Sequence, residues 1–174
     1  RSFIYLSIAE TLNLPVVAVE APNHLFVRWL FDGNHLNWET TSAEEKTDSY
    51  YINYHHISPK SISNGVYLNS LTREQTIGIV YTDRGLVWRN RGDFDKALEY
   101  LNKAISLNPK NAGAYNNRGD VWRKKGDLYK SIEDFSTAIR LDPNHAAAYY
   151  NRGLVLAQIG DETKELDRAA ATGY

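Results

Sequence analysis

The chain has 174 residues, 43% of them hydrophobic and 24% charged, and its formal net charge is −1. These values are typical of globular proteins. No apolar run approaches the roughly 20 residues that span a bilayer. Residues 1–77 carry 5 basic and 8 acidic groups, and residues 78–174 carry 15 and 13. We therefore expect neither membrane insertion nor a nucleic-acid partner, which would need a basic surface.

The chain contains no cysteine. Disulfides, thiolate metal sites and a cysteine nucleophile are therefore excluded within it, and we predict no cofactor. There is also no methionine, and Arg1 leads directly into Ser-Phe-Ile-Tyr-Leu, an apolar run at helical spacing. We interpret the chain as part of a longer protein in which any signal peptide would lie upstream. A cytoplasmic location is favoured.

The first 40 residues predict one helix packed on a small antiparallel sheet, an α+β arrangement. Apolar side chains recur at helical spacing over residues 1–13. β-Branched and aromatic runs predict strands over 16–19, 24–31 and 36–40. The sequence Asp-Gly-Asn at 32–34 predicts a hairpin turn between the second and third strands.

Three segments of this region resemble the core of a bacterial transglutaminase-like domain. They are Leu-Asn-Leu-Pro-Val-Val-Ala-Val, Ala-Pro-Asn-His-Leu-Phe-Val-Arg-Trp and Asn-Trp-Glu-Thr-Thr, and the resemblance covers roughly residues 1–70. Members of that family share the papain-like thiol arrangement of cysteine, histidine and a carboxylate or amide. The resemblance implies that His24 is the family histidine and that Glu39 stands where the family usually has aspartate. Asn37, two residues away on the same strand face, is the alternative orienting group.

The family's cysteine would fall a few residues before Arg1. An acyl-transfer triad needs a nucleophile beside its base. We therefore expect His24 and Glu39 to be a structural remnant in this chain and expect no acyl transfer from it. A metal site at His55-His56 is not predicted, because adjacent histidines point in different directions and no ligand cluster accompanies them.

Residues 59–77 are predicted to link this domain, residues 1–58, to a second one over residues 78–174. The pattern Thr72-Arg-Glu-Gln75 is typical of a capping box and predicts a helix that begins near Arg73. This helix is expected to continue into the second domain, and the N-terminal part is expected to cap the outer face of the first hairpin there.

The second domain has a 34-residue period, with repeats at 78–111, 112–145 and 146–174. An Arg-Gly pair, a Gly-Asp pair and a proline recur in phase: Arg84-Gly85, Arg118-Gly119 and Arg152-Gly153; Gly92-Asp93, Gly126-Asp127 and Gly160-Asp161; Pro109 and Pro143. This pattern resembles the tetratricopeptide repeat (TPR). The resemblance implies an all-α, right-handed superhelix of antiparallel helix pairs.

Helices are predicted over 73–91, 95–107, 112–125, 129–141 and 146–159, with a short second helix in the third repeat. Glycine inside a helix costs about 1 kcal/mol relative to alanine. Gly85 and Gly119 therefore indicate close approach of the paired helix. The repeated arginines are expected to pair locally and to cover neighbouring helices with their stems.

The first helices of stacked repeats line a concave groove. Helical phase places amide, basic and aromatic side chains there, and we predict that a peptide binds to Arg89, Asn116, Asn117, Arg123, Lys124, Tyr150 and Asn151. Chaperone-binding relatives clamp a terminal carboxylate with a set of lysine, asparagine and arginine residues. Only Asn117 matches that set, so we do not predict such a clamp.

Two functions follow. The first is a protein-interaction module that binds a peptide or partner protein in the groove, with an inactive transglutaminase-like domain as its N-terminal cap. The alternative is a fragment of a thiol acyl-transferase or peptidase whose cysteine lies upstream of Arg1.

Overall fold

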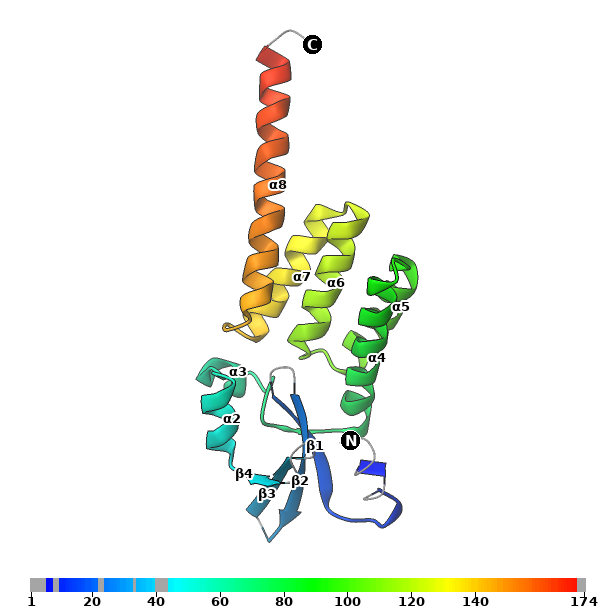
Figure 1. The fold of residues 1–174 in the computed structure, drawn as a ribbon, viewed down its shortest axis with the longest axis vertical. Coiled ribbons are helices and arrows are strands. Elements are labelled where there is room, and N and C mark those ends of the chain that lie inside the picture. The colour runs from blue at the N-terminus through cyan, green and yellow to red at the C-terminus, as the bar shows by residue number, and fades with distance from the viewer. Residues whose placement is uncertain (1–5, 8–9, 22–23, 33, 40–43, 172–174) are drawn as a thin grey trace.

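The computed structural model describes residues 6–7, 10–21, 24–32, 34–39 and 44–171, with the side chains of His24, Phe31 and residues 161–171 outside that description. An N-terminal unit, made of a sheet and two short helices, lies below a row of longer helices, next to the turns at their lower ends (Figure 1). The row consists of antiparallel pairs, as the 34-residue period predicts.

The sheet has five antiparallel strands in the order β4-β3-β2-β1-β5. Their bounds are β1 Val16–Ala21, β2 His24–Phe31, β3 Asn34–Glu39, β4 Glu44–Lys46 and β5 Ser70–Leu71. The three predicted strands are confirmed over the described residues. Of the predicted helix over 1–13, residues 6–7 and 10–11 are helical, and much of the rest lies outside the described residues.

Two short helices follow β4, helix α2 (Asp48–Tyr54) and helix α3 (Pro59–Ser63). Both helices begin with side-chain caps, because Thr47 accepts a hydrogen bond from the Tyr50 amide and Ser58 accepts one from the Ser61 amide. Helix α2 covers the sheet, and the Tyr51 ring stacks on Phe26 at a centroid distance of 4.0 Å.

The longer helices are α4 (Arg73–Asn90), α5 (Phe94–Leu107), α6 (Ala112–Lys125), α7 (Leu128–Leu141) and α8 (Ala146–Ala171). The predicted capping box is present: Thr72 Oγ1 accepts from the Gln75 amide and Gln75 Oε1 accepts from the Thr72 amide. Gly92 and Gly126 end helices with φ values of 81° and 85°, and the aspartate after each caps the next helix.

Close approach explains two of the helical glycines. A Cβ at Gly85 would lie 2.5 Å from Leu101, and one at Gly119 would lie 2.8 Å from the Phe135 ring. The repeated arginine also behaves as predicted in the second and third repeats. Arg118 forms a two-pronged pair with Asp134 at 2.7 and 2.8 Å, and Arg152 donates to Ser136 at 3.2 Å.

The predicted end of the last helix at residue 159 is wrong. Helix α8 runs without a break through Gly160 and Asp161 to Ala171 and extends well beyond its neighbours (Figure 1). The sequence supplies a reason, because Glu162 and Ala169 stand where the earlier second helices carry Phe94 or Leu128 and Leu101 or Phe135. A returning helix with these residues would lack the large apolar groups that fasten the first two pairs.

These glycines make a matched pair for a stability test. Gly119→Ala places a methyl group against Phe135 and should lower the free energy of unfolding by about 1–2 kcal/mol, the cost of overpacking less the gain in helix propensity. Gly153, one repeat later, has no atom within 4 Å of its added Cβ. Gly153→Ala should therefore raise stability by up to about 1 kcal/mol. Chemical denaturation measures both, and equal effects would contradict the packing argument.

The N-terminal unit and the repeats share one hydrophobic cluster. Ala112 and the partly buried Leu141 pack with Val19, Phe26, Tyr51, Ile57, Val66, Tyr67 and Leu68. Asp142, the residue after α7, accepts hydrogen bonds from Ser61 Oγ at 2.5 Å and Tyr67 OH at 3.1 Å. The Asn64 amide donates to the carbonyls of Arg140 and Leu141. The contact is thus made with the turns at the ends of the helix pairs.

This position differs from the predicted cap on the outer face of the first pair. On α4, Ile77, Val80 and Val87 remain 37–44% exposed. The turn after α7 supplies the acceptors that buried groups of the N-terminal unit need. The Asp142 carboxylate accepts from two hydroxyl groups, and two backbone carbonyls at the end of α7 accept from Asn64.

Candidate functional site

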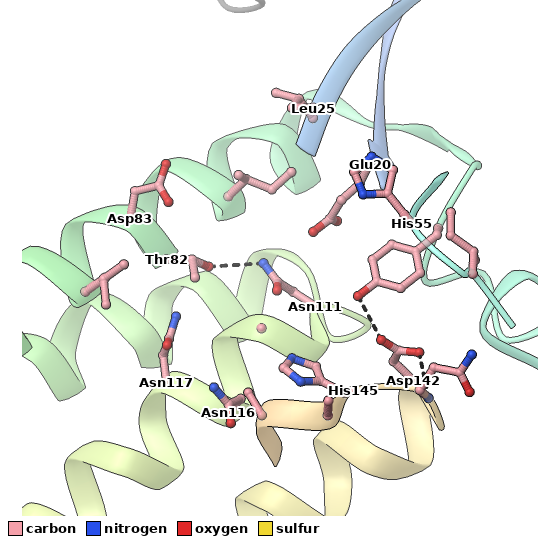
Figure 2. A pocket seen from close by; sticks show the side chains of 18 of the residues that line it. Glu20, Leu25, His55, Thr82, Asp83, Asn111, Asn116, Asn117, Asp142 and His145 are labelled. Atoms are coloured by element: carbon pink, nitrogen blue, oxygen red, sulfur yellow. Dashed lines mark hydrogen bonds between the residues drawn. The ribbon is translucent and has the colours of Figure 1, made fainter. Parts of the chain in front are cut away.

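The N-terminal unit closes one end of the concave face and leaves a pocket of about 640 Å³ there. One wall is the end of β1 and the start of β2, with Glu20 and Leu25, together with His55 and His56 after α2. The other walls are α4, α6 and the turn before α8 (Figure 2). Segments far apart in the sequence therefore build it.

The polar lining is acidic and rich in amides. It comprises three carboxylates (Glu20, Asp83, Asp142), four amides (Asn111, Asn116, Asn117, Asn144) and three histidines (His55, His56, His145). Among the described residues that line the pocket there is no lysine or arginine. Figure 2 shows the Glu20 carboxyl pointing toward the middle of the pocket.

Burial shifts the titration of several of these groups. Burial, and secondarily the negative charge of Asp83, raises the pKa of Glu20 to about 8. Burial also raises the pKa of Asp83. Burial lowers the pKa of His145, with the nearby Asp142 carboxylate acting in the opposite direction. Glu20 is therefore mainly protonated, and His145 mainly neutral, at neutral pH.

Of the three predicted asparagines, Asn116 and Asn117 line the pocket and Asn151 does not. Asn116 and Asn117 are each held by a side chain of a neighbouring repeat. Asn117 Oδ1 accepts from Arg89 at 3.2 Å, and Asn116 Oδ1 accepts from the Asn151 amide at 3.1 Å. No described residue accepts from the amide NH₂ groups of Asn116 and Asn117. Each NH₂ group is thus a fixed, available donor at the concave surface.

The basic residues of the predicted site are organised by Asp120. Arg123 donates to Asp120 Oδ1 at 2.6 Å, and Arg89 lies 3.4 Å from Asp120 Oδ2. Lys124 is exposed, as is Tyr150, which is 68% exposed. Five of the seven predicted residues therefore make side-chain contacts, in two groups: Arg89, Asn117 and Arg123 around Asp120, and Asn116 with Asn151. The Asp120 carboxylate offsets part of the positive charge of the predicted site.

The residues of the predicted catalytic remnant lie on two neighbouring strands, His24 on β2 and Asn37 and Glu39 on β3. Glu39 is buried on β3 and accepts from Tyr51 OH at 3.4 Å. Asn37 is also buried, accepting from Arg28 Nε at 2.7 Å and donating to Asp48 at 2.6 Å. His24 begins β2, and its side chain lies outside the described part of the chain. The triad geometry therefore stays a prediction.

Within the described residues, no group of three or more histidine, aspartate or glutamate side chains is arranged to hold a metal ion. None of the helices in the described ranges is both long and apolar enough to cross a membrane.

Two family models match the helical part of the chain. A model described as "Tetratricopeptide repeat" matches residues 79–111, and one described as "TPR repeat" matches residues 119–160. A search of curated proteins found no match. The fold is thus an array of helix pairs, and residues 79–111 and 119–160 of it are tetratricopeptide repeats. No comparison supports the transglutaminase-like resemblance of the N-terminal unit or a bacterial origin.

Solved structures similar to the chain include two that are described as TPR domains. The second TPR of Spaghetti (RPAP3), bound to the HSP90 peptide SRMEEVD, is 25% identical over 50% of this chain and 81% of its own, with a TM-score of 0.48. The Arabidopsis OM64 TPR domain is 23% identical over 51% and 73%, with a TM-score of 0.49. MamA is 29% identical over 48% of each chain, with a TM-score of 0.47.

Thr82, Asp83 and Leu86 of α4 also line the pocket. Sequence reasoning missed the contribution of the N-terminal unit, above all Glu20, and that of the turn residues Asn111, Asp142 and His145. The recurrence of a polar residue before each proline, Asn108 and Asp142, is a signal that the turns carry buried polar groups. No pattern in the sequence indicates that these turns lie beside β1 and share a pocket with Glu20.

Proposed function

We propose that the chain is a protein-interaction module that binds an extended peptide segment along the concave face. The observation that carries the proposal is the pair of available NH₂ donors of Asn116 and Asn117 beside a pocket of about 640 Å³. An extended peptide presents backbone carbonyls that such donors can satisfy. Leu25, Ile79 and Leu86 supply apolar contact in the same pocket.

The supporting amides are fixed before a ligand arrives. Arg89 and Asn151 hold Asn117 and Asn116 by hydrogen bonds from neighbouring repeats, so the donors lose little conformational freedom on binding. The enzyme alternative gains no comparable support, because Asn37 is engaged with Arg28 and Asp48.

The test is selection of peptides from a displayed library of random 12-residue sequences on the intact chain, followed by calorimetry of the enriched peptides. Asn117→Ala should weaken binding about five- to a hundredfold, since a lost hydrogen bond that leaves a buried partner unsatisfied costs about 1–3 kcal/mol. Lys124→Ala should weaken it less than about fivefold, because an exposed charge contributes about 0–1 kcal/mol.

Lys103→Ala on α5 is the control, because Lys103 is exposed and lies outside the pocket lining. Selected peptides that bind Asn117→Ala with wild-type affinity would place the site elsewhere. The peptide SRMEEVD belongs in the same measurements. The comparisons do not support the predicted exclusion of a carboxylate clamp, and tight binding of SRMEEVD would show that prediction to be wrong.

A further inference from the structure

Two carboxyl groups of the pocket, those of Glu20 and Asp83, have no side-chain hydrogen bond or ion pair with any described residue. The other carboxylates nearby are occupied: Asp142 accepts from Ser61 and Tyr67, and Asp120 is paired with Arg89 and Arg123. Glu20 and Asp83 are therefore the two carboxyl groups of the pocket that remain available to a ligand.

The surroundings of these two groups suit a side chain with a long apolar stem and a positive end. Ile79 and Leu86 line the same pocket from α4, and Leu25 lines it from β2. Lysine and arginine side chains pack their methylene groups on apolar surface while the charged end pairs with carboxylates. A metal ion fits less well, because no described cluster of three or more metal-ligating side chains is present.

We propose that the Glu20–Asp83 end of the pocket binds a lysine or arginine side chain of the peptide held in the groove. The proposal rests on the proposed function and adds the chemical class of the ligand to it. Recognition of a positive group differs from a carboxylate clamp, which requires positive charge on the protein.

The titration of Glu20 gives this binding a proton signature. The groups around Glu20 are Asp83 from α4, Tyr67 before β5, His55 and His56 after α2, and Asp142 and His145 before α8. Since the pKa of Glu20 is about 8 without ligand, a positive side chain must displace its proton. At pH 7.5 this releases roughly three-quarters of a proton per bound peptide, and affinity should rise about tenfold between pH 7 and 9.

The experiment uses the intact chain and four pools of 12-residue peptides, random except for one fixed central residue. That residue is lysine, arginine, glutamate or norleucine, the last being an uncharged isostere of the lysine stem. We expect the lysine and arginine pools to bind at least fivefold more tightly than the other two. The double variant Glu20→Gln/Asp83→Asn should abolish this preference, so that the four pools bind it with similar affinities.

Calorimetry in two buffers of different ionisation enthalpy measures the released proton, and Glu20→Gln should release none. Pools that bind and depend on Asn117 but show no preference for a positive residue would overturn this inference while leaving the proposed function intact. Failure of every pool to bind would overturn both. Spermidine serves as a free polyamine, and tighter binding of it than of the lysine pool would overturn the assignment to a peptide side chain.

Discussion

Asp142→Ala is expected to lower the melting temperature of the chain by about 10 °C. The carboxylate accepts from two hydroxyl groups of the N-terminal unit, Ser61 Oγ and Tyr67 OH. Ser61 is fully buried and Tyr67 is 6% exposed. Tyr67 OH would lose its acceptor, and Ser61 Oγ would keep only its contact with Ser58 Oγ, at about 1–3 kcal/mol for each lost bond. A total near 3 kcal/mol corresponds to that temperature shift, at about 2–4 °C per kcal/mol for a chain of this size.

The repeats supply a matched control for this variant. Asn108 occupies the same place 34 residues earlier, is also buried, and accepts from the Lys110 amide as Asp142 accepts from the Asn144 amide. Asn108→Ala therefore loses the same turn contact without the two bonds to the N-terminal unit. Calorimetric unfolding of both variants isolates those bonds, and equal losses would show that Asp142 does not join the two parts.

Glu20→Gln is expected to stabilise the unliganded chain increasingly as the pH rises from 6 to 8. The ordinary pKa of the carboxyl is 4.5 and burial raises it to about 8 in the folded chain. Below pH 4.5 the carboxyl group is protonated in both the folded and the unfolded state, so its raised pKa does not lower the free energy of unfolding. Between 4.5 and 8 only the folded state keeps the proton, so stability falls by up to about 1.4 kcal/mol per pH unit. Above pH 8 both states are ionised and the loss is complete.

The wild-type chain should therefore lose about 2 kcal/mol between pH 6 and 8 relative to the Glu20→Gln variant, which corresponds to about 5 °C in melting temperature. Thermal unfolding at half-unit pH steps measures the difference. Glu99→Gln, an exposed position on α5, makes the same chemical change away from the pocket and should follow the wild-type curve. Parallel curves for wild type and Glu20→Gln would show that burial does not raise the pKa of Glu20.

The helices could be predicted because their signals are local and repeated. Gly92-Asp93 and Gly126-Asp127 end one helix and cap the next, and both positions follow from residue type alone. Strands β4 and β5 were missed, because three residues and two residues are too short to show an alternating pattern. Helix α8 was predicted too short, because Gly160-Asp161 matches the Gly-Asp pairs that end the earlier helices. Such a pair ends a helix only where the following segment has apolar groups to bury as a second helix.

The candidate site was predicted in part, for a similar reason. Asn116 and Asn117 were found because they share one helix face. Glu20 and Asp142 were not, because their place in the pocket depends on how β1 and the turn after α7 meet, and no local pattern encodes that contact. The site is also less positive than the prediction implied, because Arg123, predicted to bind the peptide, is paired with Asp120.

The bonds from Asp142 to Ser61 and Tyr67 span 81 and 75 residues of sequence. A ribosome adds about 5–20 residues per second, so roughly ten seconds of synthesis separate the two ends of these contacts. During that interval the nascent N-terminal unit has emerged without the acceptor that its two hydroxyl groups require. The helix pair of α4 and α5 is complete earlier, since its contacts are local and form quickly. The sheet is therefore synthesised before α4 and α5 but reaches its final structure after them.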